Sequence, residues 1–374
     1  MIIEAIELQD YRNYDSLSLR LNPGTNIFYG DNAQGKTNLL EAVFMASTSK
    51  SYRMSRDRDL IRFGAEEAHI KMTVRKRGVP YRIDLHLKKN KTKGIAIDEV
   101  PIRKASELFG IANVVCFSPE DLSLIKDGPA MRRRFLDLEL CQLDRLYLHD
   151  LTCYNRVLNQ RNRLLRDILY KPSLQDTLSA WDKELTDYGG RIIEARARFI
   201  ERLGRRTAEL HSSLSGGRER LILSYEQSVS AAEFGEKLTA IRAAELRQHI
   251  SLLGPHRDDI RFMINERDIR KFGSQGQQRT AALSLKLSEI ELVRELLDDS
   301  PILLLDDVLS ELDSKRQNYL LKTLRDTQNI ITCTGLDDFI ENRFHIDALF
   351  RVEEGRVEMG METMPQKTGQ SRKT

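Results

Sequence analysis

A glycine-rich segment near the N-terminus has the residue types and spacing of a phosphate-binding loop. The run Gly30-Asp31-Asn32-Ala33-Gln34-Gly35-Lys36-Thr37 fits the pattern G-x-x-x-x-G-K-[ST] in full. Such glycines let the backbone curl so that its N–H groups converge on phosphate oxygens, and a helix that begins there adds a favourable dipole. Lys36 is expected to reach the β- and γ-phosphates of ATP, and the Thr37 hydroxyl to ligate Mg²⁺. The alternative is a glycine turn whose lysine is only solvated.

Two adjacent acids later in the chain could complete such a site. Asp306 and Asp307 follow the apolar run Ile302-Leu303-Leu304-Leu305, which predicts a buried strand. Ligands of open α/β sheets bind outside the carboxyl ends of the strands. Asp306 is therefore expected to hold Mg²⁺, and Asp307 to orient or deprotonate an attacking water as the catalytic residue. The alternative is a strand that runs into an acidic turn.

A second group of hydrogen-bond donors precedes a predicted helix at 277–297. Within Gly273-Ser274-Gln275-Gly276-Gln277-Gln278-Arg279, the residues Ser274, Gly276 and Gln277 could bind an anion at the helix start. One ATP has little need of two such places. A head-to-tail dimer would use both, each copy covering the nucleotide of the other. The alternative is that Ser274 only caps the helix.

The elements that must position these residues change in character along the chain. Alternating apolar residues predict strands up to about residue 29 and antiparallel β structure between 70 and 97. From 131 to about 213 the pattern predicts packed helices, with turn signals only at Lys171-Pro172-Ser173 and Gly189-Gly190. Strands return at 302–305 and 330–333, separated by a helix at about 314–325.

These elements predict an α/β fold in which one mixed sheet lobe is split in sequence by an inserted, mainly helical lobe. The expected boundaries are 1–127 for the N-terminal half of the sheet lobe with its antiparallel part, 128–252 for the helical lobe, 253–363 for the C-terminal half and 364–374 for a disordered tail.

Composition excludes several classes of protein. Hydrophobic residues make up 40% of the 374 residues and the net charge is only +3, which excludes wholesale disorder. No stretch of ~20 apolar residues predicts a membrane span, and the first residues do not look like a signal peptide. The four cysteines are scattered, so a reducing cytoplasm is the expected location.

Local charge is far from neutral in one short segment. Between residues 71 and 93 there are nine Lys or Arg and one acid. DNA phosphates would relieve their repulsion, without regard to base sequence. The predicted DNA contacts are Lys71, Arg75, Lys76, Arg77, Lys88, Lys89, Lys91 and Lys93. Six arginines between 191 and 206 form a second candidate, and a solvated surface is the alternative for both.

Taken together, these motifs resemble the ABC-type ATPase heads of the SMC and DNA-repair class. In that class the phosphate loop, a Leu-Ser-Gly-Gly-Gln-like signature, the acidic strand end and a Ser-x-Leu-Asp loop follow in this order, the last being Ser310-Glu311-Leu312-Asp313 here. The resemblance narrows to the RecF family on three further segments: Leu8-Gln9-Asp10-Tyr11-Arg12-Asn13-Tyr14, Phe117-Ser118-Pro119-Glu120-Asp121-Leu122 and Gly254-Pro255-His256-Arg257-Asp258-Asp259.

The resemblance implies a function in recombinational repair and replication-fork maintenance. It implies an ATP-dependent homodimer that clamps duplex DNA and single-stranded or gapped DNA, and that acts with RecR and RecO to load RecA and support SOS induction. A weak, DNA-stimulated ATPase would act as the switch. It also implies that Arg12 lies near the phosphates, the alternative being a surface arginine.

The chain departs from the general ABC pattern at several positions. Gly273 and Gln275 replace the first leucine and first glycine of the signature, and Asp307 stands where a glutamate is usual. No glutamine occurs at 118–120, and Thr332 or Thr334 is the nearest polar substitute for the usual switch histidine. Two other functions remain open at this point: the ATP-hydrolysing subunit of a membrane transporter, and a structural SMC-like tether.

Overall fold

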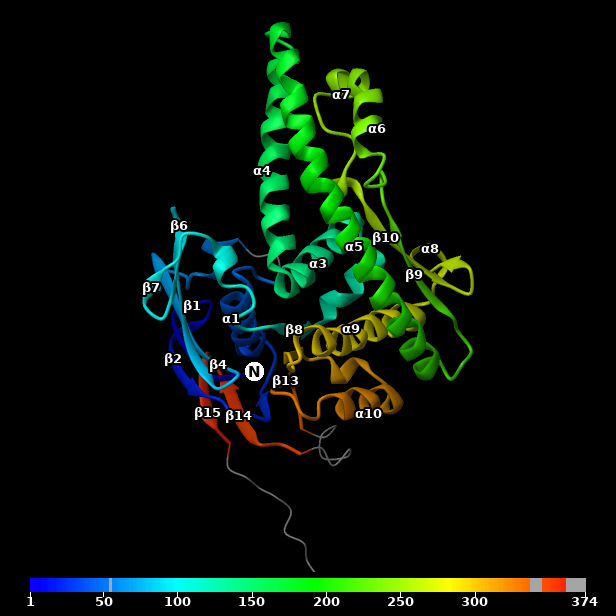
Figure 1. Cartoon of the computed structure of the whole chain (residues 1–374). Helices are drawn as coiled ribbons and strands as arrows, with labels where there is room; N and C mark the ends of the chain where they lie inside the picture. Colours follow the sequence, from blue (N-terminus) through cyan, green and yellow to red (C-terminus); the bar gives the residue numbers. More distant parts are fainter. Residues whose placement is uncertain (54–55, 337–344, 361–374) are drawn as a thin grey trace, which may run out of the picture.

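The chain forms a broad body from which a pair of helices projects as an arm (Figure 1). This computed structural model describes residues 1–53, 56–336 and 345–360. The tail expected to be disordered at 364–374 lies outside the described residues.

The central sheet of the body has the strand order β15-β14-β3-β13-β12-β8. Its strands are β3 (Thr25–Tyr29), β8 (Val114–Phe117), β12 (Ile302–Asp306), β13 (Asn329–Cys333), β14 (Ala348–Glu353) and β15 (Arg356–Met359). All neighbouring pairs are parallel except β14 and β15. Every residue of β8, β12 and β13 is buried, as expected for parallel strands that are covered on both faces. Strands from both ends of the chain thus form one sheet.

A second, antiparallel sheet has the order β2-β1-β4-β5-β6-β7. Its strands are β1 (Ile2–Tyr11), β2 (Tyr14–Arg20), β4 (Glu67–Lys76), β5 (Val79–Lys88), β6 (Lys91–Ile97) and β7 (Val100–Pro101). Side chains alternate between its faces, so Ile70, Met72 and Val74 of β4 are buried in one core with residues of helix α1 (Lys36–Thr48). The polar residues between them lie on the other face.

The core has two layers because alternate residues of the central strands face opposite sides. Leu304 of β12 packs in a cluster with Leu40 of α1, whereas Leu303 and Leu305 pack in another with residues of α9 and α10. Besides α1, the α-helices in the described part of the chain are α2 (Ser123–Lys126), α3 (Pro129–Leu143), α4 (Arg145–Asp167), α5 (Leu178–Ser215), α6 (Phe234–Ala240), α7 (Arg242–Gln248), α8 (Ile269–Phe272), α9 (Gln275–Leu297) and α10 (Ser314–Thr323).

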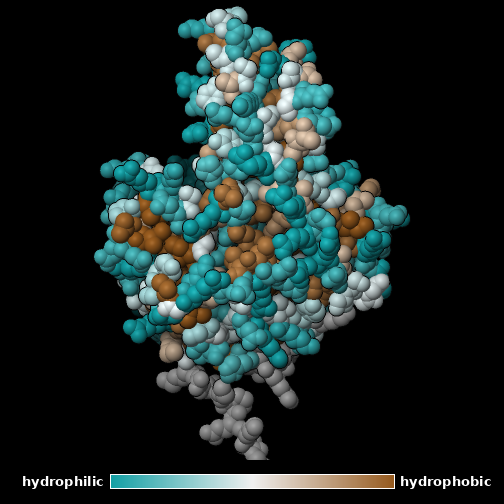
Figure 2. All heavy atoms as spheres, in the orientation of Figure 1, coloured by the Kyte–Doolittle hydropathy of each residue, from teal (hydrophilic) through white to brown (hydrophobic). Residues whose placement is uncertain are grey.

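Helices α4 and α5 form the arm (Figure 1). Residues 171–173 mark the turn between them as expected, but Gly189-Gly190 do not mark a turn, because both lie inside α5. A Cβ atom at Gly189 would come within 2.6 Å of Phe234 and 3.0 Å of Tyr154. Glycine is needed there because other elements approach the helix closely. Figure 2 shows mostly hydrophilic residues on the arm and larger hydrophobic patches on the body.

A small third sheet links the arm to the body. It has the order β11-β10-β9, with β9 (Leu221–Glu226), β10 (Asp259–Ile264) and β11 (Arg267–Asp268). The pairing of β9 with β10 crosses the lobe boundary expected at 252/253. From β11 the chain continues through α8 directly into α9.

Candidate nucleotide site

The phosphate loop joins β3 to α1 and requires glycine at two positions. Gly30 has φ 149° and Gly35 has φ 119°, values that side chains disfavour. A Cβ atom at Gly30 would lie 2.4 Å from the Val352 oxygen, and one at Gly35 would lie 2.6 Å from the Asn13 amide nitrogen. Among the described residues, no side chain caps the start of α1. The first N–H groups of the helix therefore point into the loop without a side-chain acceptor.

Lys36 is buried within the loop that it follows. Its Nζ donates to the carbonyl oxygens of Gly30 at 2.5 Å and Asp31 at 2.7 Å, and the residue is 6% exposed. Burial lowers the pKa of Lys36, which Asp307 and Asp306 partly offset. The ammonium group is thus held where phosphate oxygens would arrive in a phosphate-binding loop.

Asp306 is the point at which three parts of the body converge. Its Oδ1 accepts hydrogen bonds from the hydroxyls of Thr37 and Thr332, both at 2.8 Å. Its Oδ2 accepts from the Tyr52 hydroxyl at 3.0 Å. These residues come from α1, from β13 and from the segment after α1, and they meet because β3, β12 and β13 are parallel and end at the same edge.

Asp307 follows in a strained backbone position with φ 52°. Its N–H donates to the Thr332 hydroxyl at 3.1 Å, and the Ser310 hydroxyl lies 3.3 Å from its Oδ1. Burial and the neighbouring Asp306 raise the pKa of Asp307, although Ser310 and Lys36 act against this shift. A raised pKa makes the Asp307 carboxylate a stronger base.

The donor set fits a nucleotide with a magnesium ion. Carboxylate and hydroxyl oxygens are the protein ligands that Mg²⁺ prefers, and it is usually bound by one or two carboxylates together with substrate phosphates. Thr37 and Asp306 already lie within one hydrogen bond of each other. Lys36 and the uncapped start of α1 supply the positive side that the phosphates need.

Two residues of this site had no signal in the sequence. Tyr52 has no motif around it, although it contacts Asp306. Glu41 lies inside α1 and is completely buried, and its carboxylate accepts two hydrogen bonds from Arg12, at 2.9 and 3.0 Å. Arg12, which is predicted to contact the nucleotide, therefore lies against helix α1, where Glu41 is its partner.

Thr332 and Thr334 are the two candidates to replace the switch histidine. Of these, Thr332 contacts both Asp306 and Asp307.

The second donor group lies at the start of α9. Ser274 is the N-cap: its hydroxyl accepts from the Gln277 N–H at 3.2 Å, and its own N–H donates to the Gln277 side chain at 2.9 Å. Gln277 also donates to Glu219. Gly273 stands in place of the usual leucine because a Cβ atom there would come within 2.5 Å of the Ile269 oxygen. Ser274 and Gly276 are exposed, as is Phe272 at 73%.

The basic residues predicted to contact DNA are mostly paired within the protein. Seven of the eight contact an acid or a carbonyl oxygen. The contacts are Lys71–Glu7, Arg75–Glu4, Lys88–Glu67, Lys89–Glu66, Lys93–Asp57, Lys76 with the Gly110 oxygen and Arg77 with the Leu297 oxygen. The six arginines at 191–206 are paired with acids as well.

A buried charged cluster joins α9 to the rest of the body. Lys286 of α9 forms an ion pair with Glu289 one turn later, and both are almost completely buried. Glu139 of α3 and Asp121, which follows β8, face the same lysine. Burial raises the pKa of Asp121 to about 7, although Lys286 acts against this shift. The segment at 118–120, where the glutamine of other ABC heads is missing, is thus followed directly by an acid whose charge acts on the α9 lysine.

Comparisons with known proteins agree with this geometry. The family described as RecF/RecN/SMC N terminal domain matches residues 2–358. A DNA replication and repair protein RecF of Agathobacter rectalis is 56% identical over 359 residues, which cover 96% of this chain and 99% of that protein. The chain belongs to the RecF family.

Other RecF proteins and structures match over the same length. RecF of Lachnospira eligens is also 56% identical, over 96% of this chain and 99% of its own. A structure of the recombination mediator protein RecF with ATP is 35% identical, with a TM-score of 0.90 over 96% of this chain and 97% of that one. An Smc head from Pyrococcus furiosus shares the fold, at 16% identity and a TM-score of 0.55.

These matches confirm the family and the fold predicted from the sequence: an ABC-type head with a split mixed sheet and a helical lobe. The similar proteins are DNA replication and repair proteins. The two other functions left open by the sequence, a transporter subunit and an SMC-like tether, are therefore set aside. Within the described part of the chain, no helix combines the length and apolar character that crossing a membrane requires.

Proposed function

We propose that this RecF-family protein is an ATP-dependent DNA-binding protein in which ATP drives two chains into a dimer that clamps DNA. The observation that carries this proposal is the convergence of Thr37, Thr332 and Asp306 beside Lys36 and Asp307. The RecF relative that was solved with ATP, at 35% identity, supports ATP as the nucleotide.

In the ATP-bound state, residues 30–37 hold the phosphates. Their N–H groups donate to phosphate oxygens, and Lys36 exchanges its two carbonyl acceptors for the β- and γ-phosphates. Thr37 and Asp306 would hold Mg²⁺, which when bound neutralises charge on the phosphates. Tyr52 and Thr332 keep the Asp306 carboxylate in place. Arg12 would have to leave Glu41 to contact the nucleotide.

Hydrolysis depends on Asp307. Its carboxylate orients the attacking water and accepts a proton from it, for which its raised pKa is suited. The Ser310 hydroxyl beside Oδ1 and the Thr332 contact at the backbone fix the direction of this side chain. The side chain is one methylene shorter than the usual glutamate, and we expect slow turnover that resets a switch.

The start of α9 supplies the contact with the second chain. Ser274 and Gly276 are exposed and lie beside the exposed Phe272, so a partner can reach them. The Ser274–Gln277 pair leaves N–H groups of the first turn for an anion of the partner. Because each chain carries its own phosphate loop, that anion would be the ATP bound to the other chain.

A groove between the body and the arm is the surface that best fits DNA. It consists of two adjoining hollows that share Lys104, Ser106, Leu148 and Thr152, and the larger has a volume of about 970 Å³. Among the described residues, seven cations line it: Lys50, Arg56, Lys104, Arg133, Arg134, Arg145 and Arg156. Of its three acids, Asp57 already pairs with Lys93 and Asp137 with Arg196. Phosphates would meet a net positive surface here, which the paired sheet lysines do not offer.

Membership in the RecF family supports a place for the protein in the cytoplasm, at single-strand gaps and stalled forks. A RecF relative is described as a recombination mediator in the RecFOR pathway, which supports RecR and RecO as partners. RecA loading and SOS support would follow from the same role.

Sedimentation with Mg²⁺ and ATP tests the switch. The wild-type protein should dimerise, and Asp307→Asn should dimerise more persistently because ATP binds but water activation is lost. Ser274→Arg should bind ATP as a monomer. If Asp307→Asn stays monomeric, the switch is contradicted. If Ser274→Arg dimerises and hydrolyses ATP like the wild type, the serine is only a helix cap.

A further inference from the structure

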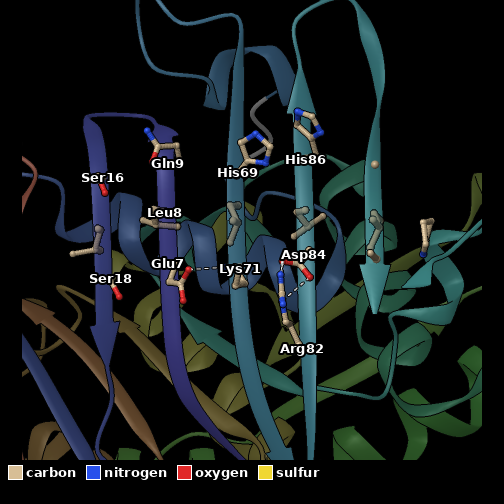
Figure 3. A pocket seen from close by; sticks show the side chains of 17 residues that line it. Glu7, Leu8, Gln9, Ser16, Ser18, His69, Lys71, Arg82, Asp84 and His86 are labelled. Atoms are coloured by element: carbon tan, nitrogen blue, oxygen red, sulfur yellow. Dashed lines mark hydrogen bonds and ion pairs between the residues drawn. The ribbon is translucent and has the colours of Figure 1, made fainter. Parts of the chain in front are cut away.

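The open face of the antiparallel sheet carries a row of polar side chains to which the proposed function assigns no role. It forms a shallow hollow of about 570 Å³ across β1, β2, β4, β5 and β6. Figure 3 shows His69 of β4 and His86 of β5 side by side on this face, with Gln9 of β1 in the same row. The two imidazoles are the unusual members of this row, because the other polar side chains labelled there are common on solvated sheets.

The strand register brings these imidazoles together with one carboxylate. His69 and His86 are directly opposite partners of an antiparallel pair, with ring centroids 4.0 Å apart. Glu67 lies two residues before His69 and so on the same face. Gly94 is the partner of His86 on the next strand, so that no side chain covers this ring from β6.

The separations are close to those of a metal centre. One ligand atom from each of Glu67, His69 and His86 lies within 4.8 Å of the other two. The Glu67 carboxylate is 2.9 Å from His86 Nε2 and 3.8 Å from His69 Nε2. Two ligands at 2.0–2.1 Å from a tetrahedral Zn²⁺ lie about 3.3 Å apart. Exposed side chains can make the remaining movement by small rotations, and all three are at least 32% exposed.

The types of the three side chains favour a cation of the softer kind. Lys88, at 3.5 Å from Glu67, is the nearby competitor for the carboxylate. Two imidazoles with one carboxylate suit Zn²⁺, Cu²⁺ or Ni²⁺ far better than Mg²⁺.

We propose that Glu67, His69 and His86 form a binding site for one divalent transition-metal ion of the Zn²⁺ class. Three protein ligands leave a fourth position for water or an outside ligand. The site is separate from the nucleotide site, which uses oxygen ligands, and it does not depend on the proposed function. Mg²⁺ in excess should therefore not displace the ion.

Zn²⁺ binding to the full chain tests this assignment. A chromophoric chelator in competition with the protein, with excess Mg²⁺ present, should report one Zn²⁺ per chain. His86→Gln and His69→Gln should each weaken binding about tenfold or more, because an amide keeps hydrogen bonds but is a poor zinc ligand. His345→Gln is the matched control, since His345 is exposed and pairs with Asp347 elsewhere.

Two further readouts separate the site from a fold effect. Co²⁺ should give a visible absorption band in the wild type that both ring variants lose. All variants should keep the metal-free thermal midpoint and the ATP affinity of the wild type, since these side chains are exposed. The assignment is overturned if the chain binds no Zn²⁺ at stoichiometric concentration. It is equally overturned if the double variant His69→Gln/His86→Gln binds Zn²⁺ like the control.

Discussion

At the nucleotide site, charged groups are buried and converge on one place, whereas on the antiparallel sheet they are exposed and neutralised in pairs. Lys36 is 6% exposed and is held by two carbonyl oxygens beside two carboxylates. Lys88 and Lys89 have side chains about 40% exposed, each opposite a single glutamate. A buried charge has lost its hydration, so a ligand of opposite charge that compensates for this loss binds favourably. An exposed ion pair contributes only about 0–1 kcal/mol to stability, and because its charges are neutralised it attracts a further charged ligand weakly.

The largest effect should come from the buried lysine. We expect Lys36→Ala to weaken ATP binding about 100-fold or more, because no other cation in the described loop replaces it. Isothermal titration with Mg²⁺ and ATP measures this loss. Lys88→Ala is the matched control and should bind ATP as the wild type does; a similar loss in both would remove the contrast between the two regions.

A smaller effect should separate the groove from the sheet in DNA binding. Replacing Lys104, Arg145 and Arg156 together by Ala should make the slope of log K against log salt on duplex DNA shallower by roughly 2.7. Replacing Lys71, Lys88 and Lys89 together should leave the slope almost unchanged, because these lysines already pair with acids. Fluorescence anisotropy at several salt concentrations gives both slopes. If only the sheet variant changes its slope, the DNA surface is the sheet.

The smallest effect should come from Asp121, whose pKa is raised chiefly by desolvation. With its pKa raised from 3.8 to about 7, folded Asp121 binds a proton that the unfolded chain releases between these values. Stability should therefore fall as the pH rises from about 4 to about 7. Asp121→Asn should match the wild type only near pH 4 and unfold at a higher temperature at pH 8, by roughly 2 °C for each 1 kcal/mol of cost removed.

The control for this pH effect is Glu209→Gln, a change at an exposed acid of α5 that does not act on Asp121. It should leave the pH dependence of the thermal midpoint as in the wild type. Equal midpoints of Asp121→Asn and wild type at pH 8 would mean that Lys286 compensates fully for the buried carboxylate.

The same contrast explains how much the sequence alone could predict. The phosphate loop is local, so its eight residues specify their own backbone, and the buried strands at 114–117 and 302–305 are short apolar runs. The pairing of Lys71 with Glu7, or of Arg12 with Glu41, joins residues from different elements and leaves no local pattern. Charge counted along a strand also ignores that successive side chains face opposite ways. The turn expected at Gly189 was wrong for a related reason. The side chains that require glycine there, Tyr154 and Phe234, are distant in sequence.

Helix α5 is one unbroken rod between the tip of the arm and the body. Near its start it packs on α4, and near its end Arg202 and Arg206 pair with Glu295, and His211 lies beside Ser284, all on α9. Its 38 residues span about 57 Å. A tilt of about 5° at the α9 end would carry the far end sideways by about 5 Å over that length. Small tilts of α5 where it contacts α9 would thus be magnified into movements of the arm comparable to one turn of a helix.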